Sequence, residues 1–417
     1  MNENYSDSEW KYKKRVLKEV IAQVLKDFPV VVLSGARQVG KSTFLQEEFP
    51  EFKYLSMDDF SVLEQAKIDH ISLWKDVDKV IIDEAQKVPE IFSAVKLTVD
   101  RTRRKKKFIL SGSSDLLLMK NITESLAGRA IYLEMYPLTI GEIIENFTNF
   151  LNFKTLFEEN LELNQLKQPL FIPKPIEYYL IKGFMPPLLY VESLQSAILW
   201  WKSYVKTYLE RDLRDFARIE SLIDFRKVMS SLAFRCANQI NQTEIARDTG
   251  ISQPTVYRYL NLLEITSIIR RIFPYFPAKA KRIIKTPKVF FIDPALAVYL
   301  TGYSEEKMLQ KAREKGAFFE NLVFLHLKVN CAISLPKAEL YFYRDTTGLE
   351  VDFVVEKGTK IVAFEAKLTN SPSLRDVKNL LKFLEKFPET LRSVVIHAGE
   401  EIKWLHSKIL ALPWWYL

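Results

Sequence analysis

Cysteine and histidine are scarce in this sequence. Two cysteines and four histidines occur among 417 residues. Cys236 and Cys331 have no regular spacing, which excludes a disulfide framework and is typical of reduced, buried thiols. The histidines lie far apart and lack the spacing of zinc ligands, so we expect no structural zinc site; they are His70, His326, His397 and His406.

Long apolar runs and an excess of acidic residues are also missing. No segment approaches the roughly 18 consecutive apolar residues of a membrane-spanning helix, and the N-terminus is polar and acidic, unlike a secretory signal. We therefore expect a cytoplasmic protein that does not associate with membranes. The net charge is +8, which favours a polyanionic partner, although an evenly solvated excess of lysine gives the same total.

The first 150 residues are expected to form a parallel α/β domain. Helical stretches alternate there with short apolar runs, which is the order of a parallel sheet covered by helices. The expected strands are 30–33, 53–56, 80–82, 108–110 and 130–134. Because 417 residues exceed what one ordinary core accommodates, further domains are expected after this one.

Three further parts are expected along the chain. Residues 151–225 are largely helical and interrupted by prolines, so they are interpreted as a helical lid and connector. Residues 226–288 contain a helix, a turn at Gly250, a second helix capped by Ser252 and a strand, the order of a winged helix-turn-helix. Residues 289–417 form a mixed α/β domain, with expected strands at 340–343, 350–355, 361–366 and 393–397 and expected helices at 317–329 and 373–387.

The clearest motif is a phosphate loop. It reads Gly35-Ala36-Arg37-Gln38-Val39-Gly40-Lys41-Ser42-Thr43, fits G-x-x-x-x-G-K-[ST], and lies between an expected strand and an expected helix. Its glycines let the backbone wrap phosphates, and its N–H groups form an anion nest at the helix N-terminus. We expect Lys41 at the β- and γ-phosphates, Ser42 on Mg²⁺ and Thr43 beside the α- and β-phosphates, with Arg37 as a further contact. The motif predicts ATP and Mg²⁺ as cofactors.

An apolar strand that ends in two acids follows the phosphate loop. It reads Lys79-Val80-Ile81-Ile82-Asp83-Glu84, which is the Walker B arrangement. Asp83 is expected to hold Mg²⁺ through water, and Glu84 to polarise the water that attacks the γ-phosphate. Acids at strand ends are also common surface residues, which is the alternative role for Glu84.

Residues after the next two expected strands complete the predicted catalytic set. Ser113 or Ser114 is expected to orient the attacking water; the alternative is a turn with capping serines. An arginine is needed because negative charge develops on the transferred phosphoryl group. Arg129 is the first candidate and Arg103 or Arg104 the next, with a structural salt bridge as the alternative role of Arg129. An arginine supplied by a second copy would require a homo-oligomer.

These segments resemble prokaryotic AAA+ ATPases that carry an uncharacterised C-terminal domain with a winged helix and a PD-(D/E)xK nuclease-like fold. The resemblance implies an AAA+ parallel-sheet domain with a helical lid, and ATPase activity. The sequence departs from the family pattern at Gly183, where two adjacent glycines are usual. The resemblance covers nearly the whole chain, through 35–43, Ile82-Asp83-Glu84-Ala85-Gln86, 110–114, Leu126-Ala127-Gly128-Arg129, 137–139, 208–213, 287–293 and Glu365-Ala366-Lys367.

Basic clusters and the expected recognition helix indicate a nucleic-acid partner, DNA in the first instance. Six of the seven residues 101–107 are basic, and a second cluster lies at 279–288; such clusters neutralise phosphates and release counterions. The alternative is a protein partner, because winged helices also bind proteins and basic runs also form solvated loops. The residues expected to meet DNA are Gln253, Thr255, Tyr257 and Arg258 on the helix, with Lys281 and Arg282 after the wing.

An acid followed by Glu-x-Lys suggests a nuclease-like site near the C-terminus. Asp352 and Glu365 would hold a metal ion there, and Lys367, two residues on and on the same strand face, would orient water. Glu320 on the preceding helix is a further acid. The alternatives are a cross-strand salt bridge and a degenerate domain that grips DNA without cleaving it or is purely structural.

Taken together, these features predict a Mg²⁺-dependent AAA+ ATPase that acts on DNA through its C-terminal parts. Two alternatives remain open. One is a nucleotide-switched regulator or scaffold that binds a protein and turns over little ATP. The other is an ATP-dependent metal nuclease that uses Asp352, Glu365 and Lys367.

Overall fold

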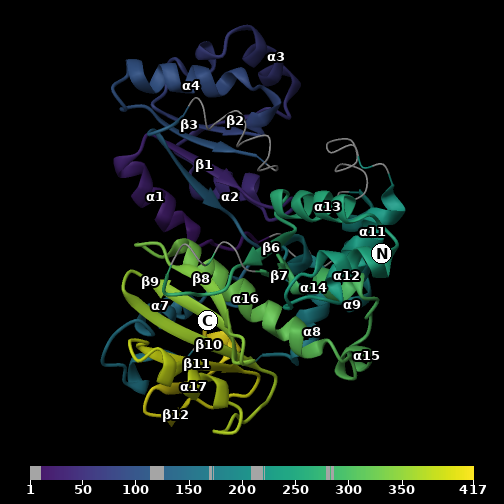
Figure 1. The fold of residues 1–417 in the computed structure, drawn as a ribbon. Helices are drawn as coiled ribbons and strands as arrows, with labels where there is room; N and C mark the ends of the chain where they lie inside the picture. Colours follow the sequence, from purple (N-terminus) through teal and green to yellow (C-terminus); the bar gives the residue numbers. More distant parts are fainter. Residues whose placement is uncertain are drawn as a thin grey trace, which may run out of the picture. The chain divides into compact units, whose positions relative to one another are not determined.

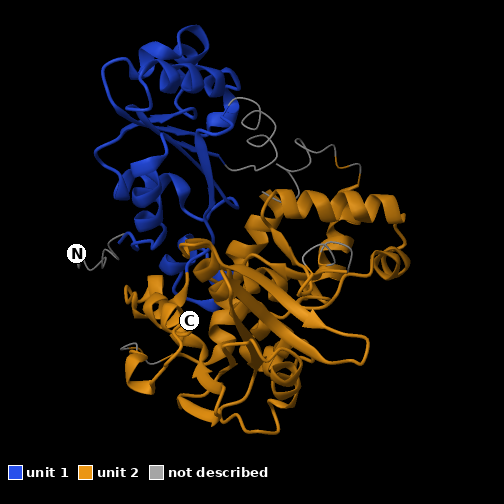
Figure 2. Ribbon diagram, turned by 60° about the vertical axis from the view of Figure 1, so that its left-hand side comes forward, with its two compact units in different colours: residues 1–138, 185–197 blue, residues 139–184, 198–417 orange. Residues whose placement is uncertain are grey.

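The chain folds into two compact units. The structure is a computed structural model that describes residues 11–112, 126–168, 171, 173–207, 219, 221–278, 282 and 286–417. Unit 1 comprises residues 1–138 and 185–197, and unit 2 comprises residues 139–184 and 198–417 (Figure 2). This division is coarser than the four domains expected from the sequence, and it divides the expected lid and connector, 151–225, between the two units.

Unit 1 is built on a five-stranded parallel sheet (Figure 1). The strand order is β2-β3-β4-β1-β5, and every neighbouring pair is parallel. All five strands predicted from the sequence are confirmed, with bounds that differ by one residue at most. They are β1 (Val30–Ser34), β2 (Lys53–Ser56), β3 (Lys79–Asp83), β4 (Lys107–Ser111) and β5 (Ala130–Glu134).

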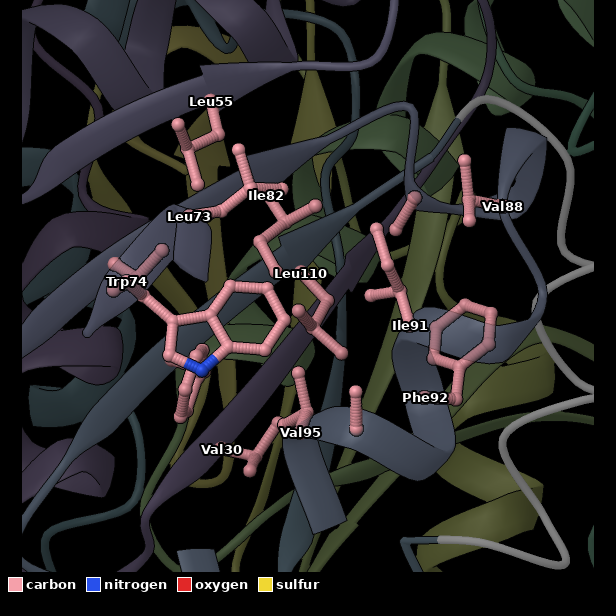
Figure 3. Packing of buried hydrophobic residues seen from close by; sticks show 14 of the residues in the cluster. Val30, Leu55, Leu73, Trp74, Ile82, Val88, Ile91, Phe92, Val95 and Leu110 are labelled. Atoms are coloured by element: carbon pink, nitrogen blue, oxygen red, sulfur yellow. The ribbon is translucent and has the colours of Figure 1, made fainter. Parts of the chain in front are cut away.

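Helices cover both faces of this sheet, with α1 and α2 on one side and α3 and α4 on the other (Figure 1). Their bounds are α1 (Leu17–Asp27), α2 (Lys41–Glu48), α3 (Phe60–Ile68) and α4 (Glu90–Arg101), with short turns η1 (Ile71–Trp74) and η2 (Ala85–Lys87). In α4 the buried residues include Ile91, Val95 and Val99, the four-residue spacing of one helix face. That face packs on Ile82 and Leu110 of the sheet in the cluster of Figure 3.

The first half of unit 2 is mainly helical. It contains α11 (Leu222–Ala233), α12 (Gln242–Thr249) and α13 (Gln253–Ile265), followed by the antiparallel pair β6 (Ile269–Ile272) and β7 (Lys288–Phe291). Gly250 ends α12, and the Ser252 hydroxyl accepts the N–H of Thr255 as the N-cap of α13. The predicted order of two helices, joined by a turn and followed by a strand, is therefore confirmed.

Shorter helices surround these elements. They are α6 (Ile140–Ile143), α7 (Thr148–Thr155), α8 (Ile176–Lys182), α9 (Leu194–Tyr204), α14 (Pro294–Leu300) and α15 (Glu306–Gln310), with turns η3 (Leu163–Gln165), η4 (Pro186–Tyr190) and η7 (Trp414–Tyr416). Gly183, which ends α8, has φ +88°, and an added Cβ would lie 2.8 Å from Trp201 and 2.9 Å from Asp293. The single glycine of this segment thus stands where a side chain would collide.

The rest of unit 2 is a mixed six-stranded sheet with helices α16 (Lys315–Ile333) and α17 (Lys378–Lys386). The order is β12-β13-β11-β10-β9-β8, and the pairs β10–β11 and β11–β13 are parallel. The predicted strands correspond to β8 (Glu339–Arg344), β9 (Glu350–Lys357), β10 (Lys360–Lys367) and β11 (Arg392–His397), whereas β12 (Lys403–His406) and β13 (Ile409–Pro413) were not predicted. No helix among the described residues is both long and apolar enough to cross a membrane.

Candidate functional site

The phosphate loop connects β1 to α2 at the carboxyl edge of the parallel sheet. Gly35 has φ +145°, and a Cβ there would lie 2.3 Å from the Met135 carbonyl oxygen. Only glycine lets the loop approach the residue that follows β5 so closely. Gly40 has φ +87° and precedes the first residue of α2. The loop N–H groups and the N-terminus of α2 therefore form the cradle expected for phosphates.

Lys41 is held inside this loop. Its ammonium donates to the carbonyl oxygens of Gly35 at 2.9 Å and Ala36 at 3.0 Å, and the residue is only 6% exposed. A buried ammonium is stable only with acceptors around it. The loop thus keeps a positive charge at the position where the motif expects the β- and γ-phosphates.

The Asp83 carboxylate, at the end of β3, accepts hydrogen bonds from residues of both neighbouring strands. The Tyr54 hydroxyl, from β2, donates to its Oδ2 at 2.5 Å. The Ser111 hydroxyl, from β4, donates to its Oδ1, which also accepts the N–H of Glu84 at 3.1 Å. Parallel strands end at the same edge of a sheet, so the register of β2, β3 and β4 brings these groups together.

Glu84 follows with an unusual backbone. Its φ of +53° lies in the left-handed region, which is uncommon for a residue with a Cβ and is found at functional sites. The Gln86 amide donates to its carboxylate at 2.5 Å. Burial, and then the Asp83 charge, raise the pKa of Glu84, while Gln86 and Lys41 oppose this shift. A carboxylate with a raised pKa is a better general base near neutral pH.

Of the residues described above, Gly40, Lys41 and Glu84 line a cavity of about 430 Å³ within unit 1. Ligand sites commonly have volumes of about 300–1,000 Å³. Five segments contribute: the residues before α1, the phosphate loop with the start of α2, Glu84, the residues after β5, and the residues of η4. The lining residues are Tyr12, Lys13, Arg15, Arg37, Gln38, Gly40, Lys41, Ser42, Thr43, Glu84, Met135, Leu138, Pro186, Pro187, Leu189 and Tyr190.

Several of these residues had not been predicted from the sequence. The Arg15 guanidinium is buried and donates to the carbonyl oxygens of Val39 at 3.1 Å and Tyr136 at 2.6 Å. The η4 residues belong to the segment 185–197. This segment is part of unit 1, although the residues before it and after it in the chain belong to unit 2. The Tyr190 hydroxyl donates to the Lys11 carbonyl oxygen at 2.8 Å. No local sequence pattern predicts that Tyr190 lines this cavity, because its contact with Lys11 joins residues 179 positions apart.

The other candidates for transition-state stabilisation lie elsewhere. Arg129 forms a two-pronged ion pair with Asp100 of α4, at 2.7 and 2.9 Å, which corresponds to the structural salt bridge weighed as its alternative. Arg103 and Arg104 lie in the turn after α4 and, like Arg129, do not line the cavity. Ser113 and Ser114 lie outside the described residues. Ser111 is the serine of this region that the structure brings to Asp83.

The predicted recognition helix, α13, has the expected two faces. Gln253, Tyr257 and Arg258 are exposed and Thr255 is half-buried. Its buried residues include Val256, Leu260 and Leu263.

Arg282 needs a correction. It is 5% exposed, donates to Glu356 at 2.7 and 3.2 Å, and lies 4.6 Å from the ring centres of Tyr275 and Tyr341. Its guanidinium is engaged inside unit 2 and not presented to a nucleic acid. Lys281 lies outside the described residues.

The predicted nuclease-like residues do gather in unit 2, but around a lysine. The Lys288 ammonium, from β7, lies 3.0 Å from Glu320, 2.7 Å from Glu350 and 3.9 Å from Asp352. On β10, Lys367 pairs with Glu365 at 2.8 Å. Lys288 had been assigned to an exposed basic cluster; its side chain is instead 2% exposed.

The acids of this cluster are paired with lysines. The Lys288 ammonium neutralises Glu320 and Glu350 and lies 3.9 Å from Asp352, whereas Glu365, the second metal ligand expected from the sequence, pairs with Lys367. Within the described ranges, no group of three or more histidine, cysteine, aspartate or glutamate side chains is arranged to hold a metal ion. Burial would lower the pKa of Lys288, but the acids outweigh it and raise that pKa. Burial, with Asp352, also raises the pKa of Glu320. We assign no metal chemistry to this cluster.

Three family models match separate parts of the chain. Residues 27–144 match the model described as AAA domain, and most of this range lies in unit 1. Residues 174–307 and 315–417 match two models described as domains of unknown function, DUF8612 and DUF4143.

Similar proteins come from bacteria and archaea. An uncharacterized protein of Mycobacterium tuberculosis is 26% identical over 388 residues, which cover 92% of this chain and 80% of that protein. One of Methanocaldococcus jannaschii is 26% identical over 387 residues, with coverage of 88% and 81%. Among solved structures, the Walker-type ATPase of Pyrococcus abyssi has 17% identity and a TM-score of 0.45, covering 70% of this chain and 99% of its own. AMPPCP-bound DnaA of Aquifex aeolicus has 18% identity and a TM-score of 0.27, covering 59% and 86%.

Proposed function

We propose that unit 1 binds ATP with Mg²⁺ and hydrolyses it to ADP and phosphate. The observation that supports this most is the single cavity that Lys41, Ser42, Thr43 and Glu84 line together. Phosphate-binding and water-activating groups come from distant segments and meet there. The match of residues 27–144 to the AAA domain model supports the same assignment.

Each residue then has a defined task. The loop N–H groups and Lys41 bind the phosphates and stabilise the charge that develops on the transferred phosphoryl group. Glu84 takes a proton from the water that attacks the γ-phosphorus, and Gln86 fixes the orientation of Glu84. Mg²⁺, held by the Ser42 hydroxyl and through water by Asp83, would supply positive charge to the β- and γ-phosphates. Arg15 and Arg37 are the arginines among the described lining residues.

Replacing Gln86 is expected to change the pH dependence of hydrolysis. The raised pKa of Glu84 predicts that kcat falls on the acid side at a pH above the ordinary glutamate pKa of about 4.3. The Gln86 amide stabilises the ionised carboxylate, so Gln86→Ala raises the Glu84 pKa further and moves this acid limb to higher pH. Steady-state kcat, measured across a range of pH, tests whether the acid limb moves. Gln65→Ala, which removes an exposed glutamine of α3, should leave the limb in place; an unmoved or lowered limb in Gln86→Ala contradicts the role.

We propose in addition that unit 2 acts on DNA. The support is the exposed side of α13, with Gln253, Tyr257 and Arg258, and the net charge of +8. DNA is expected to raise the ATP hydrolysis rate, and Arg258→Ala to weaken binding of labelled duplex, single-stranded and branched DNA. Anisotropy at several salt concentrations measures the binding, since phosphate contacts make affinity fall with salt. Glu244→Gln on α12 is the control.

A rate that DNA leaves unchanged would instead favour the nucleotide-switched, protein-binding regulator. The exposed face of α13 would serve a protein partner equally well. The third alternative, an ATP-dependent metal nuclease, has little support, because the described residues contain no group of three or more His, Cys, Asp or Glu side chains arranged to hold a metal ion.

A further inference from the structure

Part of the phosphate loop has a backbone conformation that its own residues do not favour. Gln38 has a φ of +68°, in the left-handed region that residues with a Cβ rarely adopt. Gly40, two positions on, adopts φ +87° without a steric cost because it has no Cβ. A non-glycine residue stays in such a conformation only where the surrounding structure fixes it. Contacts from outside the loop are therefore needed to hold the stretch around Val39.

Arg15, which lies before α1, makes such a contact. Its guanidinium donates to the Val39 carbonyl oxygen at 3.1 Å, and to those of Tyr136 at 2.6 Å and Pro137 at 3.4 Å. Tyr136 and Pro137 follow β5, which pairs with β1 in the sheet. Arg15 is 6% exposed, and a buried guanidinium is stable only when acceptors surround it. Arg15 thus ties the loop to a segment that the sheet holds in place.

The bond to Val39 also fixes the direction of the next N–H group. A trans peptide is planar, so the carbonyl of Val39 and the N–H of Gly40 point in opposite directions. Because Arg15 holds this carbonyl, the Gly40 N–H points away from Arg15. Gly40 lines the cavity and directly precedes α2, where backbone N–H groups bind phosphate. The orientation of this one peptide therefore decides whether the Gly40 N–H is available to a phosphate.

We propose that Arg15 is a positioning residue, which holds the Val39–Gly40 peptide in its phosphate-binding orientation before the nucleotide arrives. This inference rests on the proposed nucleotide site. A loop that is ordered in advance binds more tightly, because the cost of ordering it does not oppose association. Without the Arg15 bond, Gln38 leaves the left-handed region in the free chain, and binding has to restore it. Nucleotide affinity therefore depends on Arg15 through the loop and not through a direct contact.

Arg15→Met tests this proposal, since it removes the donors and keeps most of the apolar stem. Affinity is measured with a fluorescent ADP analogue and Mg²⁺ on the full-length chain, so the result does not depend on hydrolysis. A hydrogen bond from a charged group contributes on the order of a tenfold factor, and ADP affinity is therefore expected to fall about tenfold. Lys26→Met on α1 removes an exposed charge and should leave the affinity unchanged.

A second substitution separates positioning from direct contact. Glycine adopts the left-handed region without a steric cost, so in a Gln38→Gly background the loop depends less on Arg15. The loss of affinity caused by Arg15→Met is expected to shrink several-fold in that background, which a double-mutant cycle measures. An equal loss in both backgrounds overturns the proposal in favour of a direct contact with the nucleotide.

Thermal melting shows whether each variant is folded. If Arg15→Met is not, Arg15→Lys takes its place, since a lysine keeps the charge and loses the planar fork of donors; its loss of affinity should also shrink with Gln38→Gly. Unchanged ADP affinity in a folded Arg15→Met overturns the positioning role while the nucleotide site stands. A wild-type chain that does not bind the analogue overturns the nucleotide site and this inference with it.

Discussion

Glu84→Gln is expected to abolish ATP hydrolysis while ATP binding persists. The amide cannot accept the proton of the attacking water, and a positioned general base contributes about 10²–10⁴-fold to a rate. The Glu84 side chain lines the cavity with Lys41, and glutamine keeps its size. Phosphate release at saturating ATP and binding of a fluorescent ATP analogue measure the two properties separately.

An exposed glutamate provides the control for this variant. Glu90 begins α4 and lies on the surface, so Glu90→Gln should hydrolyse ATP at the wild-type rate. Wild-type turnover by Glu84→Gln would remove Glu84 from the mechanism. Loss of binding together with turnover would give Glu84 a role in holding the nucleotide.

Lys288→Ala is expected to destabilise unit 2 by about 3–5 kcal/mol, because it leaves the part-buried carboxylates of Glu320, Glu350 and Asp352 without their buried cation. Glu320 and Glu350 both lie within 3.0 Å of the Lys288 ammonium. Urea unfolding, monitored by tryptophan fluorescence, measures the loss of stability. Lys382→Ala on the exposed side of α17 is the control, and a surface change of this kind usually alters stability by less than about 0.5 kcal/mol.

The pH dependence of this loss separates charge from packing. Lys288→Met keeps most of the apolar bulk and removes the charge. If charge is the cause, the loss of stability in Lys288→Met relative to wild type should shrink as pH falls, because protonation of Glu320, whose pKa is raised, relieves its repulsion with the neighbouring acids. A loss of equal size at low and neutral pH would indicate packing alone.

The parallel sheet of unit 1 was predictable because its signals are local. Buried parallel strands are continuous apolar runs, and the residues of β1, β3 and β4 have few polar interruptions. The phosphate loop and the Walker B motif are each contiguous in the sequence, so the sequence alone places Lys41 at the start of a helix and Glu84 at the end of a strand. In the structure Lys41 and Glu84 line the same cavity.

Groups that act through tertiary contacts could not be predicted in this way. Tyr54 and Ser111 reach Asp83 only because the register of three strands aligns their ends. Tyr190 enters the cavity from a segment that the sequence assigned to a lid. The periodicity and spacing of the residues around Tyr54, Ser111 and Tyr190 do not predict these tertiary contacts.

Charge in the sequence also says little about burial. Lys288 and Arg282 appeared to extend a basic surface, yet each is buried against acids. The Arg282 partner, Glu356, is 74 residues away in sequence.

β13 was missed for a different reason. It is a short, fully buried strand of five residues, and such a run cannot be distinguished from other buried segments by periodicity.

The most direct test of the account is calorimetric titration of ATP, with Mg²⁺, into the wild-type chain and into Lys41→Ala. The account predicts that wild type binds one ATP per chain and that Lys41→Ala loses most of this affinity, because the buried ammonium that meets the β- and γ-phosphates is gone. Equal binding by the two proteins, or no binding by wild type, would contradict the assignment of this cavity as an ATP site.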